Sequence, residues 1–133
     1  MKKFILSLFV SLLVTTAVWA QSQGSGSTNA VDLKVKFKKE TLDFGTAKFN
    51  KPVTVTYEFT NISKEPVLIE NVKASCGCTV PTWTKEPVLP GKTGKITATY
   101  SANAIGKPTK TVYFKRKGVD QEKELILTGT VEN

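Results

Sequence analysis

The sequence predicts an all-β protein, an immunoglobulin-like antiparallel β-sandwich of about seven strands. Apolar and polar residues alternate with a period of two in several short stretches, the pattern of strands with one buried face. Turns rich in Gly, Pro and Asn separate these stretches over roughly a hundred residues. No run of about ten or more residues has helical periodicity. An antiparallel barrel fits the same strand count, so that alternative stays open.

The first twenty residues have the organisation of an export signal. Lys2 and Lys3 precede a mainly apolar stretch from Phe4 to Val18, and Ala20 offers a small residue for cleavage. An apolar run of about 15 residues is shorter than the ~20 that span a bilayer. We therefore expect a signal peptide over residues 1–20 and no membrane span once it is removed. The expected location is the periplasm or the outside of a bacterial cell.

The rest of the chain suits a flexible Ser- and Gly-rich linker over residues 21–30 and one sandwich domain over residues 31–133. After loss of the signal, seventeen basic and eleven acidic side chains remain. The lysines are spread along the strands rather than gathered in one block, as on solvated faces and protected sheet edges. We therefore expect no nucleic-acid partner; oligomeric state is not predicted.

The expected strands follow one another in order. Residues 33–37 alternate apolar residues with lysines, which indicates an edge strand. Residues 42–45 (LDFG) suit a short strand that ends in a tight bend. The clearest strand covers residues 53–60 and stops at Asn61, where NISKEP has turn chemistry.

The second half of the chain continues the same pattern. Residues 67–72 are apolar apart from Glu70 and Asn71, as in a central strand that is covered on both faces. Residues 79–83 are extended, and Pro81 marks them as an edge or irregular strand. Leu89-Pro90-Gly91 predicts a turn. The remaining strands are expected near residues 96–102, 112–114 and 125–131, with a loop around Gly106 and a basic turn over residues 115–118.

The residue inventory restricts the possible chemistry. The sequence has no histidine, and Met1 is its single methionine, so a histidine-based catalytic dyad and a thioether copper site are excluded. No acid pair, serine-base arrangement or phosphate-binding loop is recognisable. We accordingly assign no catalytic residue, no cofactor and no metal ligand, and expect a non-enzymatic protein.

Both cysteines lie in the stretch SCGCTVPTW, from Ser75 to Trp83. In a flat strand their Cβ atoms would be roughly 6.6 Å apart, beyond the ~4.5 Å that a disulfide tolerates. A disulfide between Cys76 and Cys78 therefore needs a bend at Gly77, which glycine permits. A secreted chain with two cysteines normally pairs them. A bridge over one residue removes little unfolded-state entropy, so it would fix a local bend or exchange with thiols.

Four interpretations of this corner remain open. It is a structural bend, locked by a bridge or made of two buried thiols beneath Trp83; a redox site, with Lys73 and Lys85 favouring a thiolate; a two-thiolate metal site that suits Cu(I); or a point of intermolecular pairing. Trp83, Lys73 and Lys85 are also candidates for a surface contact near the motif. Core packing is the more usual role of a tryptophan in a sandwich.

The order of several motifs resembles a known family. From about Phe37 to Val131, the succession LDFG, YEFTN, VLIENV, SCGCTVPTW, LPGKTGKI and LILTGTV is similar to the bacterial domain of unknown function 1573 family. Cys-Gly-Cys followed by Thr and Pro is the most specific motif. The resemblance implies an exported immunoglobulin-like domain, distantly similar to sperm-protein and cilia-associated scaffold modules, and it brings no established activity. Residues 115–123 (KRKGVDQEK) depart from the Thr-Asn turn that the family often has there.

Together these observations predict an exported β-sandwich that binds or scaffolds unknown proteins of the cell envelope. The first alternative is a thiol-disulfide exchange protein that uses Cys76 and Cys78. The second alternative is a copper carrier.

Overall fold

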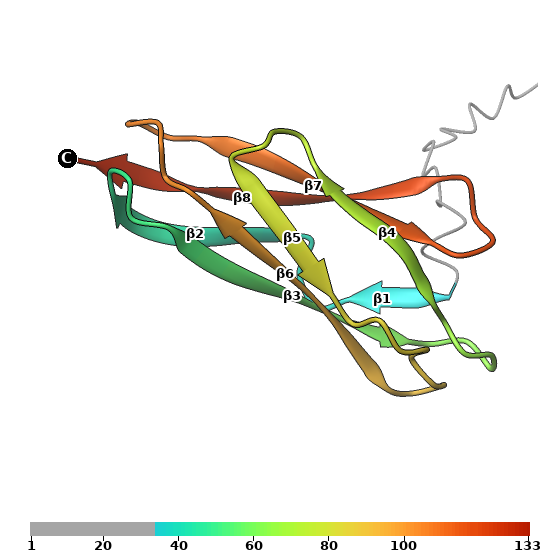
Figure 1. Ribbon diagram of the computed structural model, residues 1–133. Coiled ribbons are helices and arrows are strands. Elements are labelled where there is room, and N and C mark those ends of the chain that lie inside the picture. The colour runs from blue at the N-terminus through green and yellow to red at the C-terminus, as the bar shows by residue number, and fades with distance from the viewer. Residues whose placement is uncertain (1–33) are drawn as a thin grey trace, which may run out of the picture.

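The protein folds as two four-stranded β-sheets that pack face to face (Figure 1). The computed structural model describes residues 34–133, and this part of the chain contains strands and no helix. The predicted signal peptide (1–20) and linker (21–30) lie outside the described residues, as do residues 31–33 of the predicted domain. The prediction of an immunoglobulin-like β-sandwich is confirmed.

The first sheet has the strand order β1-β3-β6-β5, and the second has the order β2-β8-β7-β4. In chain order the strands are β1 (Val35–Phe37), β2 (Thr41–Lys48), β3 (Val53–Asn61), β4 (Ile69–Ala74), β5 (Thr79–Trp83), β6 (Thr93–Tyr100), β7 (Thr109–Arg116) and β8 (Glu122–Glu132). Neighbouring strands are antiparallel except β2 and β8, which are parallel. The described residues thus form eight strands, one more than the approximate number predicted.

The amino-terminal segment serves both sheets, and both strands expected there, at residues 33–37 and 42–45, are present. β1 pairs with β3 in the first sheet, and the chain then crosses over so that β2 pairs with β8 in the second. The sequence interpretation ended the LDFG strand at Gly45, but β2 continues to Lys48. Gly45 has a φ of +74°, and the register of β2 against β8 shifts between Asp43 and Thr46. The glycine therefore forms a bulge within the strand rather than its end.

The prediction for residues 67–72 was wrong in one respect. β4 begins at Ile69 and is an edge strand of the second sheet, not a central one, and it exposes Glu70 and Lys73 to solvent. Val67 lies before the strand, where it forms an isolated bridge with Val88 and is buried. The first part of the apolar run is thus a loop that closes one end of the sandwich. Its burial explains why apolar residues follow one another there instead of alternating with polar ones.

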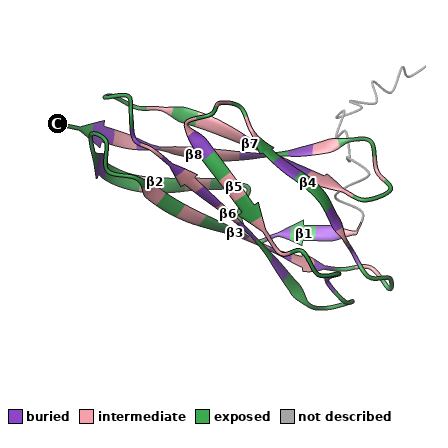
Figure 2. Ribbon diagram, in the orientation of Figure 1, coloured by how far each residue is buried: buried purple, intermediate pink, exposed green. Residues whose placement is uncertain are grey.

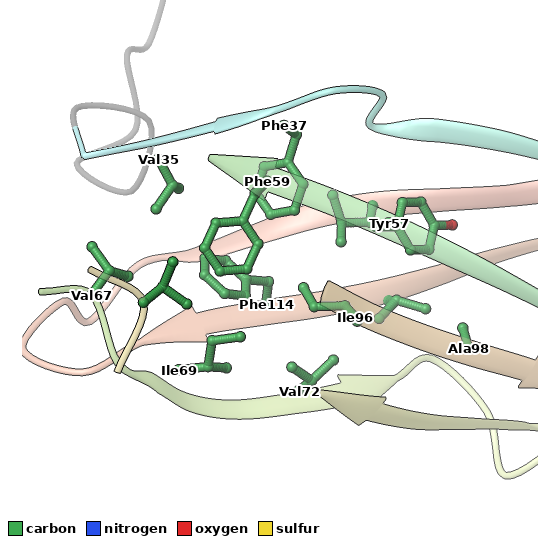
Figure 3. Packing of buried hydrophobic residues seen from close by; sticks show 13 residues of the cluster. Val35, Phe37, Tyr57, Phe59, Val67, Ile69, Val72, Ile96, Ala98 and Phe114 are labelled. Carbon is green, nitrogen blue, oxygen red and sulfur yellow. The ribbon is translucent and has the colours of Figure 1, made fainter. Parts of the chain in front are cut away.

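The core lies between the sheets and follows from the alternation of apolar residues along the strands (Figure 2). The rings of Phe37, Phe59 and Phe114 meet near its centre, with centroids 5.4 to 5.5 Å apart (Figure 3). Tyr57 crosses the same space, and its hydroxyl donates a 2.8 Å hydrogen bond to the carbonyl of Ile126. Burial raises the pKa of Tyr57 to about 12 because it disfavours the phenolate. This aromatic cluster joins the two sheets.

A second, smaller cluster extends the core toward the carboxyl-terminal end of β8. Tyr100, Leu127 and Val131 are its larger buried members, and Phe44 and Cys78 pack against it. Phe44 fits there because Gly129 has no side chain: a Cβ at Gly129 would overlap the ring. The candidate site borders this second cluster.

Candidate functional site

The corner formed by Ser75–Cys78 connects the two sheets at the side of the sandwich. It joins β4, an edge strand of the second sheet, to β5, an edge strand of the first (Figure 1). The prediction that Pro81 lies in an edge strand is confirmed. In an antiparallel pair every second residue forms backbone hydrogen bonds with the partner strand. The amide of Ser101 donates to the carbonyl of Cys78, so residues 78, 80 and 82 direct their backbone groups toward β6. The nitrogen of Pro81 therefore faces away from β6. Its missing N–H therefore falls on the free edge, where no partner strand needs it.

Hydrogen bonds hold both ends of the corner. The amide of Ser75 donates to the carbonyl of Thr111 on β7 (2.8 Å), and the amide of Thr111 donates to the Ser75 hydroxyl (3.1 Å). At the other end, the amide and the hydroxyl of Ser101 both donate to the carbonyl of Cys78 (2.9 and 3.1 Å). The corner is thus attached to β7 in one sheet and to the end of β6 in the other, which fixes its shape.

The two cysteines lie side by side within this corner. Their Sγ atoms are in close contact and their Cα atoms are 5.2 Å apart, closer than the roughly 6.6 Å of a flat strand. The chain therefore bends at Gly77, as expected. The bend does not depend on glycine, however, because Gly77 lacks a positive φ and an added Cβ would meet nothing within 4 Å. Both cysteines are half-buried, and Cys78 packs against the second cluster.

The structure does not bring Trp83 over the cysteines. Trp83 ends β5, whereas Cys78 precedes the start of that strand, and Trp83 packs against the first core cluster. The Nζ of Lys85 lies 3.1 Å from the centroid of the Trp83 ring, a cation–π contact. Trp83 is therefore a core-packing residue, and Lys85 covers the outer face of its ring.

Lys73 lies on β4, two residues before the corner, and its ammonium group is held elsewhere. Its Nζ is 2.8 Å from Oε1 of Glu122 and 5.4 Å from the centroid of the Tyr113 ring. Lys73 thus interacts with Glu122 and Tyr113, and Lys85 interacts with Trp83, rather than with the cysteine sulfurs.

A buried tyrosine lies next to the corner. Tyr100 pairs with Thr79, the first residue of β5, and is fully buried. Its hydroxyl has no hydrogen-bond partner within the described part of the chain. A buried polar group without a partner costs free energy, so the Tyr100 hydroxyl lowers the stability of the fold.

Metal-ligating side chains do not gather in the described region. Within residues 34–133, no three Cys, Asp or Glu side chains lie together in a way that suits a metal ion. A surface depression lies away from the corner, where the chain crosses between the sheets, and Lys38, Leu42 and Glu58 contribute to its walls. In the same residues we find no helix that is long and apolar enough to cross a membrane.

Sequence reasoning missed the polar residues that hold the corner. Ser75 precedes the turn, and a serine in that position often bonds to local backbone groups, so this signal was available. Ser101 and Thr111 carry no such signal, because they lie 23 and 36 residues from their partners in the sequence. Only the pairing of the strands brings them to the corner.

Comparison with sequence families gives one match that covers most of the chain. Residues 35–131 match the family described as "Protein of unknown function (DUF1573)". No curated protein matches the chain.

Solved structures resemble the fold at low sequence identity. A protein of unknown function from Porphyromonas gingivalis W83 superimposes with a TM-score of 0.61 at 10% identity, over 73% of this chain and 46% of that one. A PapD-like domain of human CEP192 gives 0.60 at 10% identity, over 75% and 86%. The secreted serine protease VesC from Vibrio cholerae gives 0.57 at 10% identity, over 76% and 24%. This chain thus spans less than half of the Porphyromonas protein, and the likenesses establish the fold alone.

Proposed function

The chain belongs to the DUF1573 family of proteins of unknown function, and from that premise we propose a role based on its own surface: an exported, non-enzymatic module that binds or scaffolds other proteins in the bacterial cell envelope. The observation that carries this proposal is the Ser75–Cys78 corner, a rigid loop at the edge of both sheets. Ser75 and Gly77 are exposed at its tip. Val80, two residues beyond it, is 61% exposed although it is a large apolar residue.

A fixed, protruding loop beside an apolar side chain favours protein contact. Hydrogen bonds to Thr111 and Ser101 already order the corner, so a partner that binds it need not order the loop again. Loops on a rigid scaffold are the usual place for binding residues in sandwich proteins. The cysteine pair supports the same role when bridged, because it limits the motion of the corner.

Export rests on residues 1–20, with their lysines, apolar stretch and small residue at the cleavage position. It also fits a pair of neighbouring cysteines, since disulfides persist in oxidising compartments. Fractionation of the source cells tests this part of the proposal. We expect a mature protein that begins at Gln21 in the periplasm or the medium; a cytosolic protein with residues 1–20 intact contradicts export.

Site-specific crosslinking in living cells tests the binding role. A photoreactive amino acid at position 80 should give a discrete adduct with another protein, and the Cys76→Ser, Cys78→Ser variant should weaken it. The matched control is the same probe at Thr46, an exposed residue on β2. Adducts of the same kind from both positions, or none from either, contradict the assignment of the corner as the contact.

A second candidate function is thiol-disulfide exchange, favoured by the contact between the sulfur atoms of two half-buried cysteines at an accessible corner. In this reaction a substrate dithiol is oxidised to a disulfide, and the Cys76–Cys78 bridge takes up its two electrons and two protons as two thiols. Insulin reduction tests the reverse direction, in which the two thiols of the reduced protein pass two electrons and two protons to an insulin disulfide. Added dithiothreitol, which is itself oxidised to a disulfide, returns the protein to its dithiol form for the next turnover. Turnover by the wild-type chain that the double serine variant lacks would make exchange the primary function.

A further inference from the structure

Two loops of the protein share an unusual local pattern. The β2–β3 loop contains Phe49-Asn50-Lys51-Pro52, and the β6–β7 loop contains Ile105-Gly106-Lys107-Pro108. Each reads as a large apolar residue, a residue with positive φ (56° at Asn50 and 116° at Gly106), a lysine and a proline. The left-handed residue turns the chain sharply, and the proline limits the backbone that follows. Both loops therefore present an apolar tip next to a lysine.

The two loops meet around the end of β8. The amide of Phe49 donates to the carbonyl of Glu132 (2.6 Å), while Gly106 and Val131 exchange backbone hydrogen bonds of 2.9 and 2.8 Å. The amide of Asn50 also donates to the carbonyl of Ala102, the second residue of the other loop (2.9 Å). Figure 1 shows the β2–β3 turn and the β6–β7 loop at the same end of the sandwich as the carboxyl terminus. We call this end, with the exposed side chains of Phe49, Lys51, Ile105 and Lys107, the two-loop pole.

The two-loop pole combines exposed apolar surface with unpaired positive charge. Phe49 is 41% exposed and Ile105 is 58% exposed. Lys51 and Lys107 are both exposed, and within residues 34–133 no carboxylate forms an ion pair with either of them. The other described lysines include several that do pair with acids, such as Lys73 with Glu122. The charges of Lys51 and Lys107 are thus available to an external anion, and the exposed Glu132 lies at the same end without pairing to either of them.

We propose that the two-loop pole docks on the surface of an anionic phospholipid bilayer. Phe49 and Ile105 enter the boundary between headgroups and acyl chains, and Lys51 and Lys107 remain at the level of the lipid phosphates. This arrangement is the one by which interfacial proteins combine apolar insertion with electrostatic attraction. Lysine suits it because its apolar stem stays near the bilayer while the ammonium group remains hydrated.

The shape of the pole favours a bilayer over a protein partner. A stable protein interface buries about 800 Å² on each side, whereas the large apolar side chains that the pole exposes are those of Phe49 and Ile105 alone. A bilayer adapts to the two loop tips because its headgroups rearrange around them. The surface also lies on loops that the Ser75–Cys78 corner does not include, so this inference does not depend on the proposed protein-binding role.

Vesicle sedimentation of the full chain tests the inference. We expect binding to phosphatidylcholine vesicles that contain phosphatidylglycerol, little binding to pure phosphatidylcholine, and weaker binding as salt is raised. Lys51→Ala with Lys107→Ala should weaken binding about 25-fold, since each surface lysine contributes about fivefold. Phe49→Ser with Ile105→Ser should weaken it by at least a comparable factor.

Matched variants elsewhere on the protein provide the controls. Lys64→Ala with Lys92→Ala removes two exposed lysines from the opposite end, and Ile62→Ser with Leu89→Ser removes two exposed apolar side chains. Both controls should bind vesicles as the wild-type chain does. Equal effects of pole and control variants, or no preference of the wild-type chain for phosphatidylglycerol, would overturn the proposal.

A second measurement distinguishes bilayer contact by the pole from bilayer contact by residues 1–33, which every variant contains. Tryptophan is introduced as Phe49→Trp and, for comparison, as Val80→Trp, and the vesicles carry lipids with brominated acyl chains. The fluorescence of the new tryptophan is obtained by subtracting the signal of the chain without it. This fluorescence should be quenched by the brominated lipids when the tryptophan is at position 49 and not when it is at position 80. Equal quenching at the two positions, or none at position 49, would show that the chain meets the bilayer by another surface.

Discussion

The side chain of Asn61 donates a 2.8 Å hydrogen bond from Nδ2 to the carbonyl of Val88. Nδ2 also donates to the carbonyl of Glu65 (2.7 Å), while Oδ1 accepts from the amide and the hydroxyl of Ser63 (2.9 and 2.8 Å). Asn61 is fully buried, and all four of its hydrogen-bonding positions are used. One side chain therefore ties the loop after β3 to the segment before β6.

Replacing this side chain should destabilise the protein without changing its topology. Asn61→Ala removes four hydrogen bonds and leaves a space where the buried amide packed. The carbonyls of Val88 and Glu65 each keep one other donor, whereas the Ser63 amide loses its acceptor. We expect the free energy of unfolding to fall by about 2–3 kcal/mol. Urea unfolding followed by far-ultraviolet dichroism measures the effect. The control Asn71→Ala removes an exposed asparagine from β4 and should change stability by less than about 0.5 kcal/mol; a similar loss in both variants would contradict the role of Asn61.

Gly94 should not tolerate a side chain. A Cβ at this position would overlap the Phe59 ring and press against Val88, so Gly94→Ala must shift the centre of the core and should cost about 1–3 kcal/mol. The matched control is Gly77→Ala, because an added Cβ there meets nothing and the backbone has no positive φ. Urea midpoints compare the two; a Gly77 variant that is the less stable of the pair would contradict this account of the corner.

The cysteine pair should contribute little to global stability. A bridge between Cys76 and Cys78 closes a ring of three residues, for which the chain-entropy relation gives about 1.5 kcal/mol. The Cys76→Ser, Cys78→Ser variant should therefore keep the wild-type far-ultraviolet dichroism spectrum and unfold at a modestly lower urea concentration. A variant that fails to fold would show that the corner nucleates the sandwich rather than shaping its surface.

Alkaline pH should destabilise the protein through Tyr57. Its pKa is raised from 10 to about 12 in the folded state, because burial disfavours the phenolate. The unfolded chain therefore loses this proton first, so the contribution of Tyr57 is complete below pH 10 and is lost as the pH rises toward 12. Tyr57→Phe, compared with the wild type by urea unfolding at pH 8 and at pH 11, should lose less stability between the two conditions. An equal loss would assign the alkaline sensitivity to other groups.

Several features could be predicted from the sequence because they depend on neighbouring residues. The turn at Leu89-Pro90-Gly91 forms as expected: the amide of Lys92 donates to the carbonyl of Leu89, and Gly91 has a φ of +74°. Val112 and Phe114 face the core while Tyr113 faces outward, as their alternation indicates. The side on which a residue falls is a local property of a strand.

Other features depended on contacts between distant parts of the chain. Whether β4 lies at the centre or at the edge of its sheet depends on which strands pair, and its apolar residues do not encode that choice. The separation of Trp83 from the cysteines follows from the direction in which β5 runs along β6. The sequence therefore identified the corner, but not the serines and the threonine that hold it.

The amino-acid sequence by itself determined that this protein is a sandwich of short strands with a bent cysteine corner, because alternation, turn chemistry and cysteine spacing act over a few residues. Tertiary structure alone decided the strand order and the partners of the corner. It also decided that two loops more than fifty residues apart, at Phe49 and Ile105, lie on either side of the end of β8. Their meeting depends on the register of β2, β6 and β8, which long-range burial and backbone pairing select together.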